Sequence, residues 1–450
     1  MYTISKNKVR DTMKKSGIKT QKELAEKMNI TTNQLSMLLS PKFDPIKSNA
    51  KKLCEVLNVS LDDIMAKEQP SMYFANDSIK IAEEDKDSYN EHQYSEDNDF
   101  IDVQDIIPLQ NYNVVELFAG AGGLALGLEK SGFNTIGLVE LDKFACQSLK
   151  TNRPSWNIIE EDITKVAEIG ISNYIDTNNE IDLLSGGYPC QAFSYAGKKM
   201  GLDDVRGTMF YYYSKILDEL RPKIFLAENV RGLVNHDKGR TLETMIKVFS
   251  DLGYTIKWKV LSALNYNVAQ KRERIVIIGI RNDLVEQYKI SYKFPKSYGK
   301  KLTLKDILKN VPKSDGAKYP ESKKKVLDLV PPGGYWRDLP EHLAKEYMGK
   351  SYYSGGGRTG MARRLSWDEP SLTLTCSPAQ KQTERCHPSE TRPFSVREYA
   401  RIQSFPDSWT FSGSMANQYK QIGNAVPINF AHAVGLSIID VLNKMNNNQL

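Results

Sequence analysis

The chain has 450 residues, 40% of them hydrophobic and 26% charged, which is the composition of a globular protein with two or three domains. Its five cysteines are scattered and odd in number, which argues against a disulfide framework and indicates a reducing compartment. The sequence has neither a run of about 18 apolar residues nor an apolar leader after Met1, so we expect a cytoplasmic protein with no membrane partner.

The net charge of +6 combines two unequal parts of the chain. Residues 82–105 hold ten acidic residues against the single Lys86, a net charge of −9, so the rest of the chain carries +15. The acidic stretch has few aliphatic residues, which indicates a flexible linker, assigned to residues 67–108. The basic remainder fits a polyanionic partner such as nucleic acid, although a solvated basic surface is the alternative.

Residues 1–66 show the helical periodicity of a small all-α domain. Leu24, Ala25 and Met28 fall on one helical face, and Thr31 is placed to cap a second helix after a short break. This spacing predicts a helix-turn-helix, and it resembles the five-helix repressor-type DNA-binding domain. The alternative is a helical module of the same fold that docks on another protein.

The resemblance to repressor domains implies which side chains of this region contact DNA. Gln21 would open the first helix of the motif, and the second helix would face the major groove. Asn and Gln side chains can pair with adenine edges, which suits exposed positions on that helix. The residues expected in the groove are Thr32, Asn33, Gln34 and Met37.

Residues 109–282 alternate apolar runs with amphipathic stretches, the pattern of a doubly wound, Rossmann-like α/β sheet. The helical stretches between the runs include "GGLALGLEKSG" and "YYYSKILDEL". Five candidate strands are "VVELFAG", "NTIGLVEL", "EIDLLSGG", "KIFLAENV" and "RIVIIGIR".

A glycine-rich turn follows the first of these strands and opens a helix, where free amide groups can meet a ligand. Glu140 ends the next strand and can accept both hydroxyls of a ribose, and Asp162 follows a third strand within reach of an adenine amino group. The dinucleotide pattern G-x-G-x-x-G is broken by Ala125. We therefore expect a nucleoside without pyrophosphate, with S-adenosyl-L-methionine as the common candidate.

Six motifs, spread over about residues 112–440, occur in the order found in bacterial DNA (cytosine-5) methyltransferases of restriction-modification systems. They are "FAGAGG", "GGYPCQAFS", "AENV", "QKRERIVIIG", "RPFSVREYARIQSFPDSW" and "QIGNAVP". The resemblance implies S-adenosylmethionine as cofactor. The implied cofactor-binding residues are Phe118, Ala119, Gly120, Gly122, Gly123, Leu124, Glu140, Asp162, Ile163, Asn424, Ala425 and Val426.

The cysteine of "GGYPCQAFS" has a defined task in this family. The Cys190 thiolate would add to carbon 6 of a flipped-out cytosine and make carbon 5 nucleophilic toward a methyl group. Glu228 of "AENV" would hold a proton at ring nitrogen 3, and Arg272 and Arg274 would orient the base and support the catalytic loop. On and beside that loop, the residues implied to contact DNA are Gln191, Ser194 and Arg206.

Residues 283–391 are rich in Lys, Gly and Pro and fall where this family keeps its target recognition domain. Within them, "TLTCSPAQKQTERCHPSETRPF" is the segment expected to read bases. Cys376, Cys386 and His387 lack a fourth ligand at a usual spacing, so we expect no metal. Residues 392–450 would return to the catalytic domain, with Arg392, Arg397 and Arg401 around a helix that braces the recognition domain.

The leading hypothesis is a sequence-specific DNA (cytosine-5) methyltransferase that protects double-stranded DNA from a cognate restriction endonuclease, which need not bind it. A DNA-binding transcriptional regulator acting through residues 1–66 is the alternative, and an RNA methyltransferase is a weaker one. The methyltransferase and regulator hypotheses are compatible if the N-terminal domain binds an operator of its own gene. A single helix-turn-helix reads few base pairs, so that domain is expected to dimerise.

Overall fold

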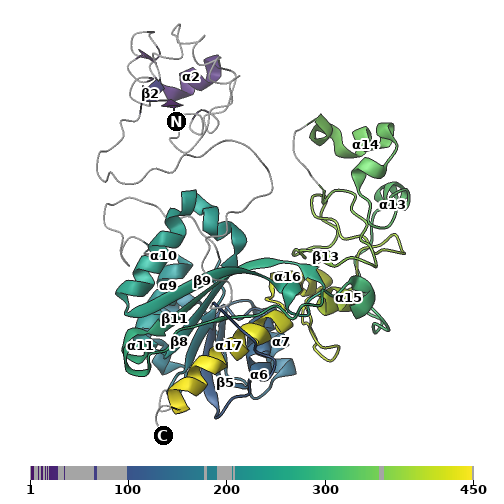
Figure 1. Ribbon diagram of the computed structural model, residues 1–450. Coiled ribbons are helices and arrows are strands. Elements are labelled where there is room, and N and C mark those ends of the chain that lie inside the picture. The colour runs from purple at the N-terminus through teal and green to yellow at the C-terminus, as the bar shows by residue number, and fades with distance from the viewer. Residues whose placement is uncertain are drawn as a thin grey trace. The chain divides into compact units, whose positions relative to one another are not determined.

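A computed structural model gives the fold (Figure 1), and contacts within the chain divide it into two units, residues 1–91 and 92–450. The first unit is described at positions 2–4, 9, 12–13, 16, 18, 20–28, 35 and 65–67. The second is described over residues 99–176, 180–189, 205, 208–353 and 359–447.

The first unit contains a short helix and a two-stranded sheet. Strand β1 (Tyr2–Ile4) pairs antiparallel with β2 (Met65–Lys67), and helix α2 (Gln21–Lys27) begins after Thr20, whose hydroxyl accepts a hydrogen bond from the Glu23 amide at 3.1 Å. Gln21 opens the helix as predicted, and the side chains expected on its apolar face are buried. The DNA contacts expected beyond α2, together with the cap Thr31, lie outside the described residues: Thr32, Asn33, Gln34 and Met37.

The second unit is built on a seven-stranded sheet in the order β6-β5-β4-β7-β8-β11-β9. Every neighbouring pair from β6 to β8 is parallel, whereas β11 runs antiparallel to both β8 and β9. The strands are β4 (Tyr112–Leu117), β5 (Phe133–Glu140), β6 (Ile158–Glu160), β7 (Leu183–Gly186), β8 (Ile224–Val230), β9 (Tyr254–Ser262) and β11 (Glu273–Arg281).

This sheet confirms the predicted α/β fold, and the five predicted strands are β4, β5, β7, β8 and β11. Strand β9 was not expected, because "YTIKWKVLS" carries Lys257 and Lys259 around Trp258 and lacks a continuous apolar run. Its place at the edge of the sheet explains that composition, since charged side chains on an edge strand discourage pairing with other chains.

Helices cover both faces of the sheet (Figure 1), and alternate residues of its central strands enter two separate cores. One core contains Val114 of β4 with side chains of α6 (Gly123–Ser131), α11 (Asn282–Tyr288) and α17 (Ile428–Asn447). The other contains Val115 with side chains of α8 (Ile163–Ile169), α9 (Met209–Leu220) and α10 (Arg240–Asp251). A further helix, α7 (Lys143–Asn152), packs along β5 and β6.

The helical stretch Met415–Asn447 is long and apolar enough to cross a membrane, although the sequence suggested no such segment. Within its most apolar stretch, 83% is buried inside the protein, so the hydrophobicity of this segment is that of a core helix. The expected linker also ends inside the second unit, because Phe100–Ile101 (β3) pairs with Phe294–Pro295 (β12). The expected domain border at 282/283 falls within packed structure as well, since Leu284 and Phe294 belong to the core beside β4.

Residues 299–391, called the small module here, enclose a hydrophobic core of their own. The module is joined to the rest of the second unit where β13 (Ser371–Leu372) pairs parallel with β10 (Gln270–Lys271), in a two-stranded sheet separate from the seven-stranded one. Its helices are α12 (Leu304–Ile307), α13 (Glu321–Asp328) and α14 (Glu341–Met348), and α15 (Val396–Ile402) and α16 (Met415–Asn424) follow it. The described 3₁₀ helices are η1 (Ile171–Asn173), η3 (Arg231–Gly239), η4 (Ala263–Asn265), η5 (Trp336–Asp338) and η6 (Gly349–Tyr353).

Candidate active site

A cavity of about 740 Å³ opens where the parallel strands end. Residues that directly follow β4, β5, β6 and β7 line it, as expected for ligands of an open α/β sheet. The small module and α16 close its other side. The predicted site residues that line it are Phe118, Ala119, Gly120, Gly123, Leu124, Glu140, Asp162, Ile163, Glu228, Arg272, Arg274, Asn424, Ala425 and Val426.

The glycine-rich turn after β4 has two kinds of glycine. Gly120 adopts a left-handed conformation, with a φ of 55°, and its amide donates to Glu140 Oε2 at 2.7 Å. At Gly123 a Cβ would come within 2.3 Å of the Val426 carbonyl oxygen, and at Gly122 one would come within 2.6 Å of Leu149. Gly122 and Gly123 therefore allow protein segments to pack closely, and Gly123 also lines the cavity.

Glu140 stands at the carboxyl end of β5 and is held by backbone amides. Its Oε2 accepts from Gly120, and its Oε1 accepts from the amides of Leu141 and Asp142 at 2.9 and 2.7 Å. A carboxylate has about four acceptor positions, so these three bonds leave capacity for about one hydroxyl group of a ligand. Asp162 similarly caps α8 by accepting from the Thr164 amide at 2.8 Å while it lines the cavity.

Two further cavity residues were missed by the sequence analysis. Leu141 is 65% exposed and lines the cavity directly after Glu140, so it offers an apolar surface beside the carboxylate. Glu116 is buried within β4, and burial raises the pKa of its carboxyl well above the usual value. The position of Leu141 after a strand-end acid was the available signal, whereas Glu116 reads in the sequence as an ordinary strand residue.

Glu228, at the end of β8, forms an ion pair across two strands with Arg274 of β11, with Nε and Oε1 2.7 Å apart. Gly187 leaves room for this carboxylate, because a Cβ there would lie 2.8 Å from Glu228 Oε2. The Asn229 side-chain amide donates to the Tyr188 carbonyl oxygen at 2.9 Å. This hydrogen bond holds the backbone at Tyr188. The next residue, Pro189, also lines the cavity and directly precedes Cys190 in the sequence.

Arg272 is 2% exposed and is held by backbone carbonyl groups. Its guanidinium donates to the carbonyl oxygens of Leu374 at 3.3 Å, Gly423 at 3.2 Å and Ala425 at 3.0 Å. Burial, together with the nearby charge of Arg274, lowers the pKa of Arg272 to about 9. Arg272, which directly precedes β11, therefore ties this side of the sheet to the small module and to the end of α16.

Two contacts across the cavity come from α16. Lys420 pairs with Asp142 at 2.8 Å, and the Cys376 thiol donates to Asn424 Oδ1 at 3.0 Å. Lys420, Asp142 and Cys376 all line the cavity, yet none was predicted to do so. Lys420 and Cys376 are distant in the sequence from the glycine-rich turn, and their segments return to the first strands only in the folded chain.

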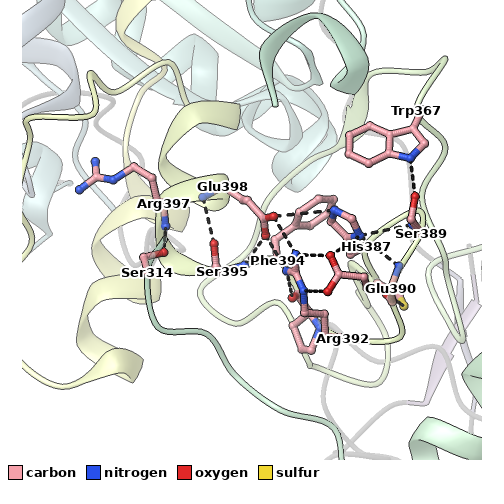
Figure 2. Close-up of polar contacts among 12 residues, drawn as sticks. Ser314, Trp367, His387, Ser389, Glu390, Arg392, Phe394, Ser395, Arg397 and Glu398 are labelled. Carbon is pink, nitrogen blue, oxygen red and sulfur yellow. Dashed lines mark hydrogen bonds and ion pairs between the residues drawn. The ribbon is translucent and has the colours of Figure 1, made fainter. Parts of the chain in front are cut away.

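The junction between the small module and α15 is a network around a buried histidine (Figure 2). His387 Nδ1 accepts from the amides of Ser389 and Glu390 at 3.3 and 3.2 Å, and Nε2 faces Glu398 at 3.7 Å. Arg392 contacts Glu398 at 2.7 Å. Of the three predicted arginines, Arg392 and Arg401 connect these parts, since Arg401 also donates to the Lys309 carbonyl oxygen at 2.6 Å. The Arg397 guanidinium instead donates to the carbonyl oxygens of Pro406 and Trp409.

His387, Cys376 and Cys386, considered above as metal ligands, contact other groups. The Cys386 thiol donates to the Glu390 carbonyl oxygen at 3.7 Å, and Cys376 contacts Asn424. Among the described residues no group of three or more metal-binding side chains occurs. The predicted residues of the catalytic loop lie outside the described residues: Cys190, Gln191, Ser194 and Arg206.

A family model described as C-5 cytosine-specific DNA methylase matches residues 112–440, and a helix-turn-helix model matches residues 11–64. The chain is 56% identical to the Type II methyltransferase M.Sau96I of Staphylococcus aureus, over 98% of this chain and 100% of the relative. It is 59% identical to M.Eco47II of Escherichia coli, a Type II methyltransferase, over 74% of this chain and 80% of the relative.

The fold is also that of solved methyltransferase structures. A DNA modification methyltransferase encoded within a prophage of E. coli superposes with a TM-score of 0.54 at 24% identity, covering 74% of this chain and all of that one. The Dnmt2 methyltransferase of S. pombe superposes with a TM-score of 0.51 at 18% identity, covering 75% of this chain and all of that one.

Proposed function

This chain belongs to the C-5 cytosine-specific DNA methylase family, and from that premise we propose that it methylates a flipped-out cytosine through a covalent adduct with Cys190. One observation carries the proposal. Glu228, Arg274 and the backbone leading through Pro189 to Cys190 meet at the cavity that also contains the predicted cofactor residues. A thiolate, a carboxyl group and a methyl donor are the components that the reaction needs.

S-adenosylmethionine fits the groups that line this cavity. Its volume of about 740 Å³ is in the range of cofactor pockets. Glu140 would hold the ribose hydroxyls and Asp162 the adenine amino group, while Leu141 and Phe118 would contact the adenine ring. When bound there, the cofactor supplies an electrophilic methyl group.

The protein residues move charge and protons on the cytosine. The Cys190 thiolate forms a bond to carbon 6, and the electrons displaced from the 5,6 double bond become available at carbon 5. Glu228 holds a proton at ring nitrogen 3, which stabilises this electron-rich ring. After carbon 5 is methylated, a base removes its proton, the electron pair of that C–H bond re-forms the 5,6 double bond, and the bond from carbon 6 to sulfur breaks, which releases the Cys190 thiolate.

Two arginines position these groups. Arg274 fixes the Glu228 carboxylate through the 2.7 Å ion pair, so that its free oxygen can face the base. Arg272 acts on the base only indirectly, because its hydrogen bonds go to three backbone carbonyl groups of the cavity wall. We assign Arg272 as a positioning residue and Glu228 as a catalytic one. Gln191, Ser194 and Arg206 would contact the DNA around the extruded base.

The relatives named as Type II methyltransferases support a role in a restriction-modification system, with a cognate endonuclease acting on the same site. We therefore propose that it acts on chromosomal DNA in the cytoplasm. Bisulfite sequencing of plasmid DNA from cells that express the chain tests the activity. Methylated cytosines in one sequence context are expected, and unmodified plasmid would refute the proposal.

A second function is favoured by the helix-turn-helix match over residues 11–64. Helix α2 buries Leu24 and Ala25 as the motif requires. We propose that this domain binds, as a dimer, an operator upstream of its own gene and limits transcription. Footprinting of the full chain on that upstream DNA tests it, and absence of protection would leave only a role in docking.

A further inference from the structure

We propose that the ion pair between Lys420 and Asp142 positions two walls of the cavity for the cofactor, and thereby sets the affinity for S-adenosylmethionine. The inference rests on the proposed methyltransferase function and assigns both side chains as positioning residues for it. Lys420 Nζ lies 2.8 Å from Asp142 Oδ2, and both residues line the cavity. Because they are 278 positions apart, the pair joins segments that meet only in the folded chain.

Asp142 connects the ion pair to the strand end that carries Glu140. Its amide donates to Glu140 Oε1 at 2.7 Å, so the two acidic residues are directly linked. Asp142 Oδ1 accepts from the amides of Phe144 and Ala145 at 3.0 and 3.3 Å, whereas Oδ2 accepts from Lys420. Burial opposes ionisation of Asp142, yet the hydrogen bonds from Lys420 and from these amides lower the pKa of its carboxyl below the usual 3.8. Loss of the lysine would therefore free one charged oxygen and leave the cap of α7 in place.

Lys420 belongs to the helix that forms the opposite wall, α16. Lys420 and Asn424 are four positions apart, which places them one turn apart on the same side of the helix, and both line the cavity. Asn424 is a predicted cofactor-binding residue, and its Oδ1 accepts from the Cys376 thiol of the small module at 3.0 Å. A displacement of α16 at Lys420 would therefore reach a predicted contact of the cofactor.

A buried contact holds the same two helices together beside the ion pair. The Ser148 hydroxyl of α7 lies 2.6 Å from Gln421 Oε1 of α16, and both side chains are buried. Lys420, in contrast, keeps 57% of its side chain exposed. The ion pair can therefore be broken without separating the helices, so its loss should affect the cavity more than the fold.

The charge of the cavity separates positioning from a general electrostatic effect. Among the described residues that line it, acidic side chains outnumber basic ones, and S-adenosylmethionine carries a net positive charge. If Lys420 and Asp142 acted only through their charges, removal of the lysine would strengthen cofactor binding and removal of the aspartate would weaken it. If the pair positions the walls, both removals weaken binding, because the cofactor must then order the walls itself.

The test is a double-mutant cycle in the full chain, with the dissociation constant of S-adenosylmethionine measured by isothermal titration calorimetry. The variants are Lys420→Gln, Asp142→Asn, the two combined, and Lys420→Arg, which retains the charge and a donor. Asparagine keeps the cap of α7, because it is as good a helix N-cap as aspartate. Each single neutral variant should raise the dissociation constant about two- to fivefold and the combined variant no further, while Lys420→Arg stays near wild type.

Lys150→Gln is the matched control. Lys150 also belongs to α7 and pairs with Glu160 at 2.7 Å, but neither residue is among the described ones that line the cavity. Its replacement should leave the dissociation constant unchanged. Methylation kinetics give a second measurement, in which Lys420→Gln should raise KM for the cofactor and leave kcat unchanged, because the pair acts on binding.

The outcomes distinguish this inference from the proposed function. Weaker binding in both single variants without further loss in the combined one, together with wild-type binding in Lys150→Gln, supports the inference. Effects of opposite sign in the two single variants, additive losses, or unchanged affinity overturn it and leave the proposed function intact. A wild-type protein that binds no S-adenosylmethionine overturns both.

Discussion

Arg274 Nε lies 2.7 Å from Glu228 Oε1, across the antiparallel strands β8 and β11 at the cavity wall. This contact joins two motifs that are 46 positions apart in the chain. Gly187 lies close to the other carboxylate oxygen, where a Cβ would come within 2.8 Å. The carboxylate is therefore held between a cation and the backbone that leads to Cys190.

Glu228→Gln should lower kcat by about 10²- to 10⁴-fold, because an amide cannot transfer a proton at ring nitrogen 3. Single-turnover methylation of a duplex oligonucleotide measures the effect. Glu273→Gln is the matched control, since Glu273 also pairs with an arginine, Arg231, at 2.6 Å, but on an exposed surface. Equal rates for the Glu228 variant and wild type would exclude the proton-holding role.

Replacing Cys190 with Ala should abolish methyl transfer while DNA binding survives, because no thiolate is left to attack carbon 6. Duplex DNA with 5-fluorocytosine at the target should trap a covalent complex with the wild-type protein, since the fluorine cannot leave as a proton does. Denaturing electrophoresis and mass spectrometry detect the adduct. Measurable turnover by the Ala variant would rule out the covalent mechanism.

Arg272→Lys should destabilise the second unit by about 2 to 4 kcal/mol, because an ammonium group cannot reach the three carbonyl groups that the guanidinium satisfies. Denaturant unfolding followed by tryptophan fluorescence measures the loss. The control is Arg337→Lys, at an exposed position of the small module, for which a change within about 0.5 kcal/mol is expected. A similar small change at Arg272 would mean that it does not brace the cavity.

His387 should make the stability of the second unit depend on pH. Burial lowers the pKa of His387 below its usual 6.5, against the opposing charge of Glu398, and its Nδ1 accepts two backbone hydrogen bonds that protonation would break (Figure 2). The unfolded chain therefore takes up a proton first as the pH falls. Stability is full above about pH 6.5 and declines below it.

Denaturant unfolding at pH 7.5 and at pH 5.5 measures this decline. In His387→Asn the side-chain oxygen can still accept a backbone amide but does not titrate, so the decline should become shallower. His342→Gln, at an exposed position of α14, is the control and should leave the decline unchanged. An identical pH profile for His387→Asn and wild type would show that His387 does not contribute.

Deleting residues 1–91 should leave methylation and its sequence context unchanged, because residues 1–91 and 92–450 form separate compact units. Gln34→Ala in the full chain should weaken operator binding by about 1 to 3 kcal/mol without altering methylation. Bisulfite sequencing and footprinting are the two measurements. Loss of sequence context in a folded truncated enzyme would contradict the separation of roles.

The sequence by itself determined the fold class and the part of the cavity lining that stands at the strand ends. The position of a short motif at a strand end can be predicted from the sequence, because the carboxyl ends of parallel strands must meet at one edge of the sheet. Glu140, Asp162 and Glu228 each follow or end such a strand and do line one cavity. Apolar periodicity likewise placed α2 and the five central strands, since burial requires it locally.

Only the tertiary structure decided which residues close the cavity from the other side. Lys420 meets Asp142, and Arg272 meets the carbonyl of Leu374, because α16 and the small module return to the sheet after long excursions. It also decided the part that Gly123 plays, since the Val426 carbonyl that crowds it lies about 300 residues further along the chain. Such contacts depend on how distant segments pack, and a local pattern of residues does not predict that packing.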